Sequence, residues 1–536
     1  MRWTLLVAGV VLSHLALGEK STAPTTHAVT ERVRAYRAAH EKEILQEFAA
    51  LLSIPNHASD AVNIRHNADA LVKLLQSRGI EASLLEAEGA PPVVFGELSS
   101  PGTTRTVSFY AHYDGQPVDA REWASDPFHP QIRDRPMEQG GEPRELALLP
   151  EHLDPEMRLY ARSTSDDKAP IVGFLTALDA LRAAGIAPSV NLKFFFEGEE
   201  EVGSPHLASI LDRYAPRLAT DLWILCDGPV HQSGRMEVFF GARGATSLDI
   251  TVYGPIHNLH SGHYGNWAPN PINLLTHLLD SMRDTDARIL IPGFNDDVRP
   301  LTRADQVAIL EIPDEDAQLR AAFQIEGSEG QPASLIAQIL KPALNVHGFQ
   351  SGRVGRDAAN VINNEATASI DFRLVPDQTP DSVQARTERY IAQQGFFVVH
   401  QVPDAATRRS HRHIANLTWG SGYPAARTPL DLPASRAVVA TIEGAVGAKI
   451  IRMPALGGSV PMYLFQHSAG RAAIPVIGVP IANYDNNQHA ANENIRLQNL
   501  WDGIEIYAVL FSQLGPALHD TATPSGRLRD DASPKR

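Results

Sequence analysis

Carboxylates and imidazoles follow short apolar runs at five widely separated places in the chain. In open α/β sheets the strands present such side chains at their carboxyl ends, where ligands bind. Oxygen and nitrogen ligands of this kind suit divalent cations, and a pair of cations would supply hydrolytic chemistry. The sequence therefore indicates a two-metal hydrolase. The residues are His112 and Asp114, Ser165 to Lys168, Glu197 to Glu201, Asp227 and His489.

Three adjacent carboxylates, Glu199, Glu200 and Glu201, follow an apolar run that ends at Phe196, with Glu197 and Gly198 in between. If they were buried without cations they would repel one another, so a metal would relieve the repulsion. A solvated loop is the alternative. His112 and Asp114 likewise allow two interpretations. The carboxylate could orient a metal-binding imidazole, or the pair could belong to a turn at the end of a strand.

The segment from Ser165 to Lys168 also has two chemical interpretations. Asp166 could bridge two metals, or Ser165 and Lys168 could form the Ser-x-x-Lys pair of serine acyl transferases. The second interpretation requires Ser-Asp-Asn and Lys-Thr-Gly elements, and the sequence contains neither. His257, His260 and His263 are spaced by three in a glycine-containing stretch. We interpret them as structural or substrate-facing histidines.

The composition is that of a globular protein with enough apolar residues for two cores. The chain has 536 residues, of which 43% are hydrophobic, and a formal charge of -15 that disfavours a nucleic-acid partner. Cys226 is the one cysteine, which excludes an internal disulfide and zinc sites built on several thiolates. Any metal must be held by carboxylates and imidazoles.

The N-terminus has the pattern of an export signal. Arg2 precedes an apolar run over residues 3–17, and small residues follow near Gly18. The sequence predicts a signal peptide over residues 1–18 and a periplasmic or secreted protein, with a signal anchor as the alternative. No later segment is apolar enough over its length to predict a membrane span.

Apolar runs alternate with helical periodicity along two parts of the chain, which predicts βαβ units and a mostly parallel sheet. Helices are expected over residues 30–52 and 64–79, and the strand at 107–110 is typical of the buried runs. Residues 246–253 and 366–375 alternate as half-exposed strands and predict a smaller α+β unit. We therefore expect an α/β fold interrupted by an inserted domain. The predicted segments are 19–243 and 406–515 for the α/β domain, 244–405 for the insertion and 516–536 for a disordered tail.

Taken together, the motifs resemble the M20 metallopeptidase family, in particular its carnosinase-like dipeptidase branch. The resemblance implies that the insertion is a ferredoxin-like lid and dimerisation domain. It covers nearly the whole chain after the export signal. The matching stretches are 112–114, 165–168, 197–204, Asp227, 260–262, 372–376, 457–461 and His489.

The resemblance implies two divalent ions, usually zinc with manganese or cobalt as alternatives. Carried over by motif, Asp166 bridges the ions, His112 and Asp227 complete one site, and Glu201 and His489 complete the other. Glu200 falls on the general base and Asp114 on the residue that supports His112. The family pattern also implies a cis peptide bond between Asp166 and Asp167.

Further residues match substrate-binding positions of the family. His260 matches a histidine that stabilises the oxyanion, often from the partner subunit of a homodimer. Arg373 matches the arginine that receives a substrate carboxylate, and Gly458 and Ser459 belong to the substrate-binding loop. Two departures concern the Asp166 loop, where Ala161, Ser163 and Ala169 replace glycines, and the substrate loop, where Ala455 and Leu456 replace an acid usual in these dipeptidases.

The expected function is hydrolysis of the amide bond of short peptides, as a dipeptidase or in a carboxypeptidase-like manner. Because the substrate loop lacks the acid, the chain would not require a free substrate amine, so an N-acyl amino acid amidohydrolase is an alternative. A member of the family that binds peptides without catalysis is a further alternative.

Overall fold

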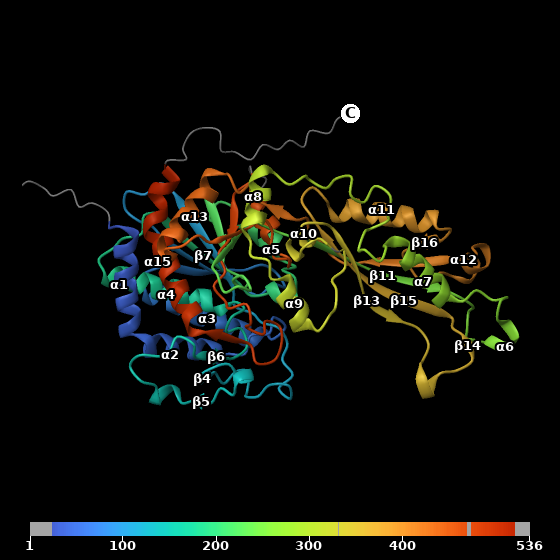
Figure 1. Ribbon diagram of the computed structural model, residues 1–536, viewed down its shortest axis with the longest axis horizontal. Helices are drawn as coiled ribbons and strands as arrows, with labels where there is room; N and C mark the ends of the chain where they lie inside the picture. The colour runs from blue at the N-terminus through green and yellow to red at the C-terminus, as the bar shows by residue number, and fades with distance from the viewer. Residues whose placement is uncertain (1–23, 331, 469–472, 520–536) are drawn as a thin grey trace, which may run out of the picture.

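The computed structural model describes residues 24–330, 332–468 and 473–519. Its ribbon divides into a thick α/β layer and a thinner arm that extends to one side (Figure 1). The predicted signal peptide and residues 520–536 of the predicted tail lie outside the described residues. Within the described residues, no helix is both long and apolar enough to cross a bilayer.

The α/β layer is built on an eight-stranded sheet whose centre is parallel. The order is β1-β2-β7-β3-β8-β20-β9-β19, and β7, β3, β8 and β20 are parallel neighbours. Antiparallel pairs flank this centre on both sides. The predicted α/β fold with a mostly parallel sheet is thus confirmed. The strands are β1 (Glu81–Leu85), β2 (Val93–Leu98), β3 (Thr106–His112), β7 (Asn191–Glu197), β8 (Leu222–Leu225), β9 (Glu237–Phe239), β19 (Ile451–Met453) and β20 (Val476–Gly478).

Helices bury apolar side chains on both faces of this sheet. One face packs on a large core shared with α1 (Thr26–Ala39), α2 (Glu41–Leu52), α3 (Ala61–Ser77), α4 (Lys168–Ala183), α13 (Pro433–Val446) and α15 (Leu497–His519). The other face packs on α5 (Leu207–Arg213) and α14 (Met462–Gln466). The helix predicted over residues 30–52 is two helices, because His40 leaves the helical backbone conformation between them.

The arm contains a five-stranded sheet with its own core. Its order is β13-β15-β11-β17-β16, and α7 (Pro271–Met282) and α11 (Pro380–Gln393) contribute to that core. We call this unit the lid. Its strands are β11 (Gly244–Tyr253), β13 (Ala343–Gln350), β15 (Glu365–Leu374), β16 (Phe397–Val399) and β17 (Ile414–Trp419).

The structure differs from the expected domain division in three places. The lid does not end at residue 405, because β17 pairs with β11 as far as Trp419. Within 244–405, the segment 303–339 leaves the lid, because Ala308, Ile312 and Ile336 pack on the two cores of the α/β layer. The tail does not begin at 516, because α15 runs to His519 with Leu518 buried. The segment holds α8 (Arg303–Glu311), α9 (Asp316–Phe323) and α10 (Leu335–Ile339).

Short elements complete the fold. A four-stranded sheet of order β21-β6-β4-β5 flanks the α/β layer, and two two-stranded sheets, β10-β18 and β12-β14, lie in the connections to the lid and within it. The strands are β4 (Gln131–Arg133), β5 (Pro143–Arg144), β6 (Arg158–Tyr160), β10 (Gly241–Ala242), β12 (Leu259–His260), β14 (Val361–Ile362), β18 (Ala426–Arg427) and β21 (Asn494–Arg496). The short helices are α6 (Ser261–Tyr264), α12 (Ala405–Ser410), η1 (Met137–Gln139), η2 (Leu146–Leu148), η3 (Glu200–Val202) and η4 (Gly355–Asp357).

Candidate active site

Three neighbouring parallel strands deliver acids and a histidine to one edge of the eight-stranded sheet. β3 ends at His112, which is in register with Glu197 at the end of β7. The turn of η3 then carries Glu200 and Glu201. On the other side of β3, β8 ends just before Asp227. The sheet therefore gathers residues that are more than a hundred positions apart in the sequence.

Asp166 lies between the two histidines of this cluster. Its Oδ1 is 2.8 Å from Nε2 of His112, and its Oδ2 is 3.1 Å from Nε2 of His489. The same His489 nitrogen is 3.2 Å from Oε2 of Glu201. Ligand atoms of His112, Asp166 and Glu201 lie within 4.8 Å of one another, and so do those of His112, Glu200 and Asp227. All six side chains are therefore near enough to share a small metal centre.

Glu493 holds the loop that carries Asp166, and the sequence motifs did not reveal this role. Its fully buried carboxylate accepts backbone N–H groups of Ser163, Ser165 and Asp166 at 2.9–3.0 Å. It also pairs with Arg162 at 2.8 Å. The Asp166–Asp167 peptide bond in this loop is cis, as the family resemblance implied.

Within the protein, the negative charges of the buried carboxylates in this cluster are not fully compensated by positive charges. Burial and the neighbouring Asp166 raise the pKa of Asp227 to about 7. Burial and Asp227 raise the pKa of Glu200 well above its ordinary value. Hydrogen bonding to Asp166 and Glu201 raises the pKa of His489 to about 10. A divalent cation would let these carboxylates ionise and the imidazoles stay neutral.

The donor set fits such a cation. Asp166 Oδ2 is buried without a hydrogen bond of good geometry, although His489 lies nearby. Carboxylate oxygens and imidazole nitrogens are ligands that zinc and manganese accept. Because no thiolate is present, the cluster does not match a structural zinc site of the usual kind.

Arg373 and Ser459 join the lid to the loop of residues 457–461. Arg373 of β15 donates from Nη1 to Oγ of Ser459 at 2.8 Å, and its Nε is 3.3 Å from Asp371. Burial and the Glu200 carboxylate raise the pKa of Tyr423, which also interacts with Ser459. The electrostatic influence of Glu200 and Arg373 on Tyr423 indicates that its hydroxyl lies between these two charges. Its position was not anticipated from the sequence, where it follows a Gly-Ser-Gly loop without a chemical motif.

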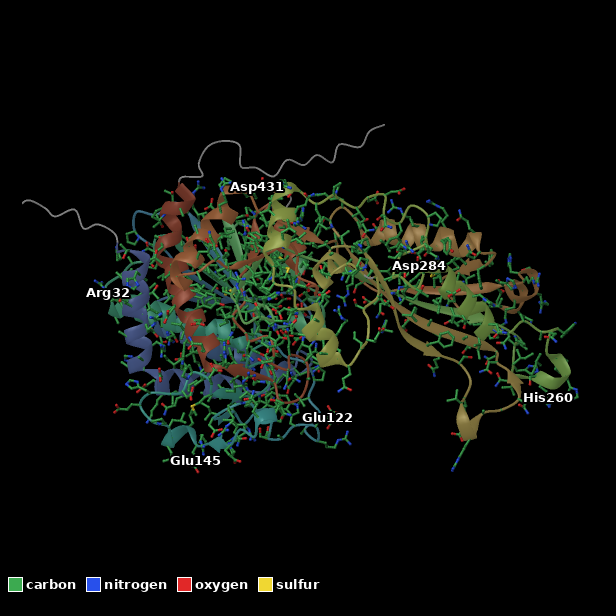
Figure 2. All side chains as sticks on the ribbon, viewed as in Figure 1. Arg32, Glu122, Glu145, His260, Asp284 and Asp431 are labelled. Carbon is green, nitrogen blue, oxygen red and sulfur yellow. The ribbon has the colours of Figure 1, made fainter. Side chains whose placement is uncertain are left out.

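His260 is not brought to the cluster within one chain. It is exposed at the start of α6, where its Nδ1 accepts the backbone N–H of Gly262 at 3.0 Å. Figure 2 shows it at the free end of the lid, away from the α/β layer. His257 and His263 belong to the same exposed stretch. Gly458 lies in the Ser459 loop, and its carbonyl accepts the backbone N–H of Arg243 at 3.3 Å.

Comparison with known proteins settles the family. The sequence pattern of Peptidase family M20/M25/M40 matches residues 108–513. This chain belongs to that family. As an M20 peptidase it is a metal-dependent peptide hydrolase, and its acid and histidine cluster is the candidate site for the divalent metal.

Curated and solved M20 relatives span most of the chain. The human Beta-Ala-His dipeptidase is 24% identical over 96% of this chain and 98% of its own length. The Cys-Gly metallodipeptidase dug1 of Schizosaccharomyces pombe is 24% identical over 79% of this chain and 83% of its own. The structure of an M20 family metallo-carboxypeptidase from Sulfolobus solfataricus aligns with a TM-score of 0.73 at 25% identity, covering 88% of this chain and 99% of that one.

In this M20 peptidase the Ser-x-x-Lys interpretation of residues 165–168 has no geometric support. Ser165 Oγ donates to Glu493 at 2.9 Å. The Lys168 ammonium instead donates to the carbonyl of Leu51 and to Asn67 at 3.0 and 2.8 Å. Lys168 is thus a buried structural residue, and its hydrogen bonds go to Leu51 and Asn67 instead of to Ser165.

Proposed function

We propose that the chain is an exported, dimeric M20 peptidase that uses two divalent ions, zinc in the first place, to cleave the amide bond of short peptides. The observation that carries the proposal is the position of Asp166 between His112 and His489, at 2.8 and 3.1 Å. One carboxylate with a separate partner on each oxygen suits a bridge between two ions. In this proposal His112 and Asp227 would hold one ion, and Glu201 and His489 would hold the other.

The ions would polarise the scissile carbonyl and make water acidic enough to attack it near neutral pH. Glu200 is placed to take the proton from that water and deliver it to the leaving amine. Its position in the cluster agrees with such a task, because ligand atoms of Glu200 lie within 4.8 Å of those of His112 and Asp227.

Arg373 and Ser459 supply the substrate side of the site. A guanidinium can receive a carboxylate through two hydrogen bonds, and Arg373 keeps one nitrogen on Ser459 at 2.8 Å. We assign this pair, with the Gly458 backbone, to the C-terminal carboxylate of the substrate. His260 would complete the site from the partner subunit and stabilise the oxyanion.

The relatives support hydrolysis of dipeptides or of C-terminal residues, since their names describe dipeptidases and a metallo-carboxypeptidase. An N-acyl amino acid has the same amide and the same carboxylate, so it would use the same groups. A substrate panel separates these activities: free dipeptides, C-terminally amidated dipeptides and N-acetyl amino acids, each assayed with zinc, manganese and cobalt.

We expect free dipeptides to be hydrolysed and their C-terminal amides to be turned over far more slowly. Arg373→Lys should raise KM for free dipeptides more than it lowers kcat, because it removes the bidentate contact and keeps the charge. Hydrolysis of N-acetyl amino acids alone would favour the amidohydrolase alternative. Peptide binding with no hydrolysis by the metal-loaded protein would favour the non-catalytic alternative.

A further inference from the structure

A cavity of about 610 Å³ lies under the segment that carries α8, α9 and α10. Its wall includes parts of three loops that also deliver the proposed site residues. Pro229 follows Asp227, Gly457 precedes Ser459, and Tyr484 precedes His489 in their loops. These shared loops connect the wall of the cavity to the proposed site.

Glu237 is a buried acid in the wall of this cavity. It lies on β9, where the next residues, Val238 and Phe239, belong to the two apolar cores on opposite faces of the sheet. Glu237 shares the face of Phe239 and is only 4% exposed. Among the described residues, none forms a hydrogen bond or an ion pair with its carboxylate. Burial alone raises its pKa to about 8, with no neighbouring cation to lower it.

The carboxylates that line this cavity with Glu237 are not accompanied by a lysine or arginine in the described part of its wall. Asp314, Glu315 and Asp316 line the same cavity, and the described residues in its wall include no lysine or arginine. The rest of the wall combines the polar residues His231, Gln232, Ser334 and Tyr484 with apolar side chains, among them Met453 and Leu456. An acid buried in an apolar wall without a partner in the chain is costly. A ligand that brings a positive charge would remove that cost.

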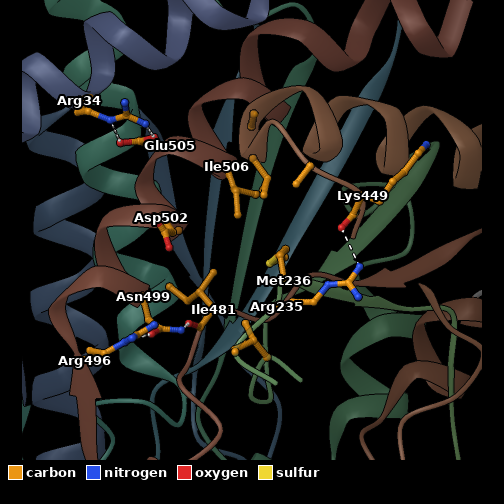
Figure 3. Close-up of a pocket in the computed structure, with 16 residues that line it drawn as sticks. Arg34, Arg235, Met236, Lys449, Ile481, Arg496, Asn499, Asp502, Glu505 and Ile506 are labelled. Carbon is orange, nitrogen blue, oxygen red and sulfur yellow. Dashed lines mark hydrogen bonds and ion pairs between the residues drawn. The ribbon is translucent and has the colours of Figure 1, made fainter. Parts of the chain in front are cut away.

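A second cavity, of about 310 Å³, differs from the first because its acids have partners within the chain (Figure 3). It also contains charged residues, but these already have partners. Arg34 forms two hydrogen bonds with Glu505 at 2.9 and 2.8 Å. Asp502 accepts a hydrogen bond from Gln498 at 2.6 Å. Its acids thus need no ligand, which makes it a natural control.

We propose that the Glu237 cavity binds the positively charged side chain of a lysine or arginine in the substrate, with Glu237 as its ionic partner. The apolar wall at Met453 and Leu456 would pack on the methylene stem, as such walls do for long basic side chains. The inference rests on the proposed peptide hydrolysis and adds a substrate class to it. Glu237 is then a specificity residue.

The test compares peptides that differ only in this charge. Dipeptides with lysine in either position are assayed against the same peptides with Nε-acetyl-lysine. We expect kcat/KM for one lysine position to exceed that of its acetylated twin at least about tenfold. In Glu237→Gln the ratio should fall to about one, and in Asp502→Asn, from the second cavity, it should stay as in the wild type.

A wild-type ratio near one, or a ratio that survives Glu237→Gln, would overturn the proposal. A readout without turnover separates its failure from that of the proposed function. Free L-lysine and L-arginine should raise the Tm of the metal-loaded protein more than norleucine does, and Glu237→Gln should abolish the difference. If no peptide is hydrolysed but this Tm shift is present, binding of a basic side chain in the cavity is supported and the proposed function is contradicted.

Discussion

The carboxylate of Asp114 lies 3.4 Å from Nδ1 of His112, and both side chains are fully buried. The same carboxylate accepts the backbone N–H groups of Glu200 and Glu201, at 3.1 and 3.0 Å. One acid therefore orients the imidazole of a proposed metal ligand and fixes the turn that carries the proposed base. This arrangement makes Asp114 a positioning residue.

Asp114→Asn should weaken metal binding about 10- to 100-fold, as other changes behind metal-bound histidines do. The amide can still accept one backbone N–H, but it no longer favours the correct tautomer of His112. Metal titration followed by calorimetry measures the affinity. Activity should recover at high metal concentration in Asp114→Asn, whereas a variant that merely misfolds would not recover.

Glu200→Gln should lower kcat by about 10²- to 10⁴-fold, because the amide cannot accept the proton of the attacking water. Ligand atoms of Glu200 also lie within 4.8 Å of those of His112 and Asp227, so the variant needs a metal count as well as an assay. Unchanged metal content with lost turnover supports the role of base. Loss of an ion would instead identify Glu200 as a ligand.

Removal of metal should abolish activity and lower the Tm. Four carboxylates, those of Asp166, Glu200, Glu201 and Asp227, meet in one cluster and would repel one another once the cation is gone. A cation present at a thousand times its Kd stabilises the folded state by about 4 kcal/mol. Chelation, dialysis and readdition of zinc, manganese or cobalt, with Tm and turnover measured at each step, checks this. Full activity in chelator would contradict the metal-dependent mechanism.

Glu237 should make stability fall as the pH rises. Burial raises its pKa from 4.5 to about 8, so the unfolded chain loses this proton at lower pH than the folded one does. Stability is therefore lost between about pH 4.5 and 8, at up to about 1.4 kcal/mol per pKa unit. Glu237→Gln lacks this titration, and its Tm relative to the wild type should increase from pH 5 to pH 9. A constant Tm difference would show that the acid has an ordinary pKa.

His260 should act only in a dimer, because it lies exposed at the free end of the lid. His260→Ala should lower kcat about 10²- to 10³-fold while metal content stays unchanged. Mixing inactive His260→Ala and Glu200→Ala chains should restore about a quarter of wild-type activity, since half of the random dimers carry one intact site. Sedimentation of a monomer, or no recovery in the mixture, would contradict this role.

The sequence by itself determined the kind of chemistry and most of the elements that position it. His112, Glu200, Glu201 and Asp227 each follow an apolar run, and parallel strands bring such ends to one edge whatever the details of packing. Motif order added Asp166 and His489, and the structure places both in the same cluster. Local signals were sufficient here because each residue's position follows from the strand or turn next to it.

Only the tertiary structure decided which distant residues support this site and where the chain divides. Glu493 has no local motif, and its role appears only when its loop folds under Asp166. Residues 303–339 lie outside the lid because their apolar side chains pack on the α/β layer. Hydrophobic periodicity predicts that a helix has a buried face, but it does not predict which of two cores that face packs against. In the sequence, Glu237 is simply one polar residue in a short strand. Its lack of a partner depends on every side chain packed around it, and that packing exists only in three dimensions.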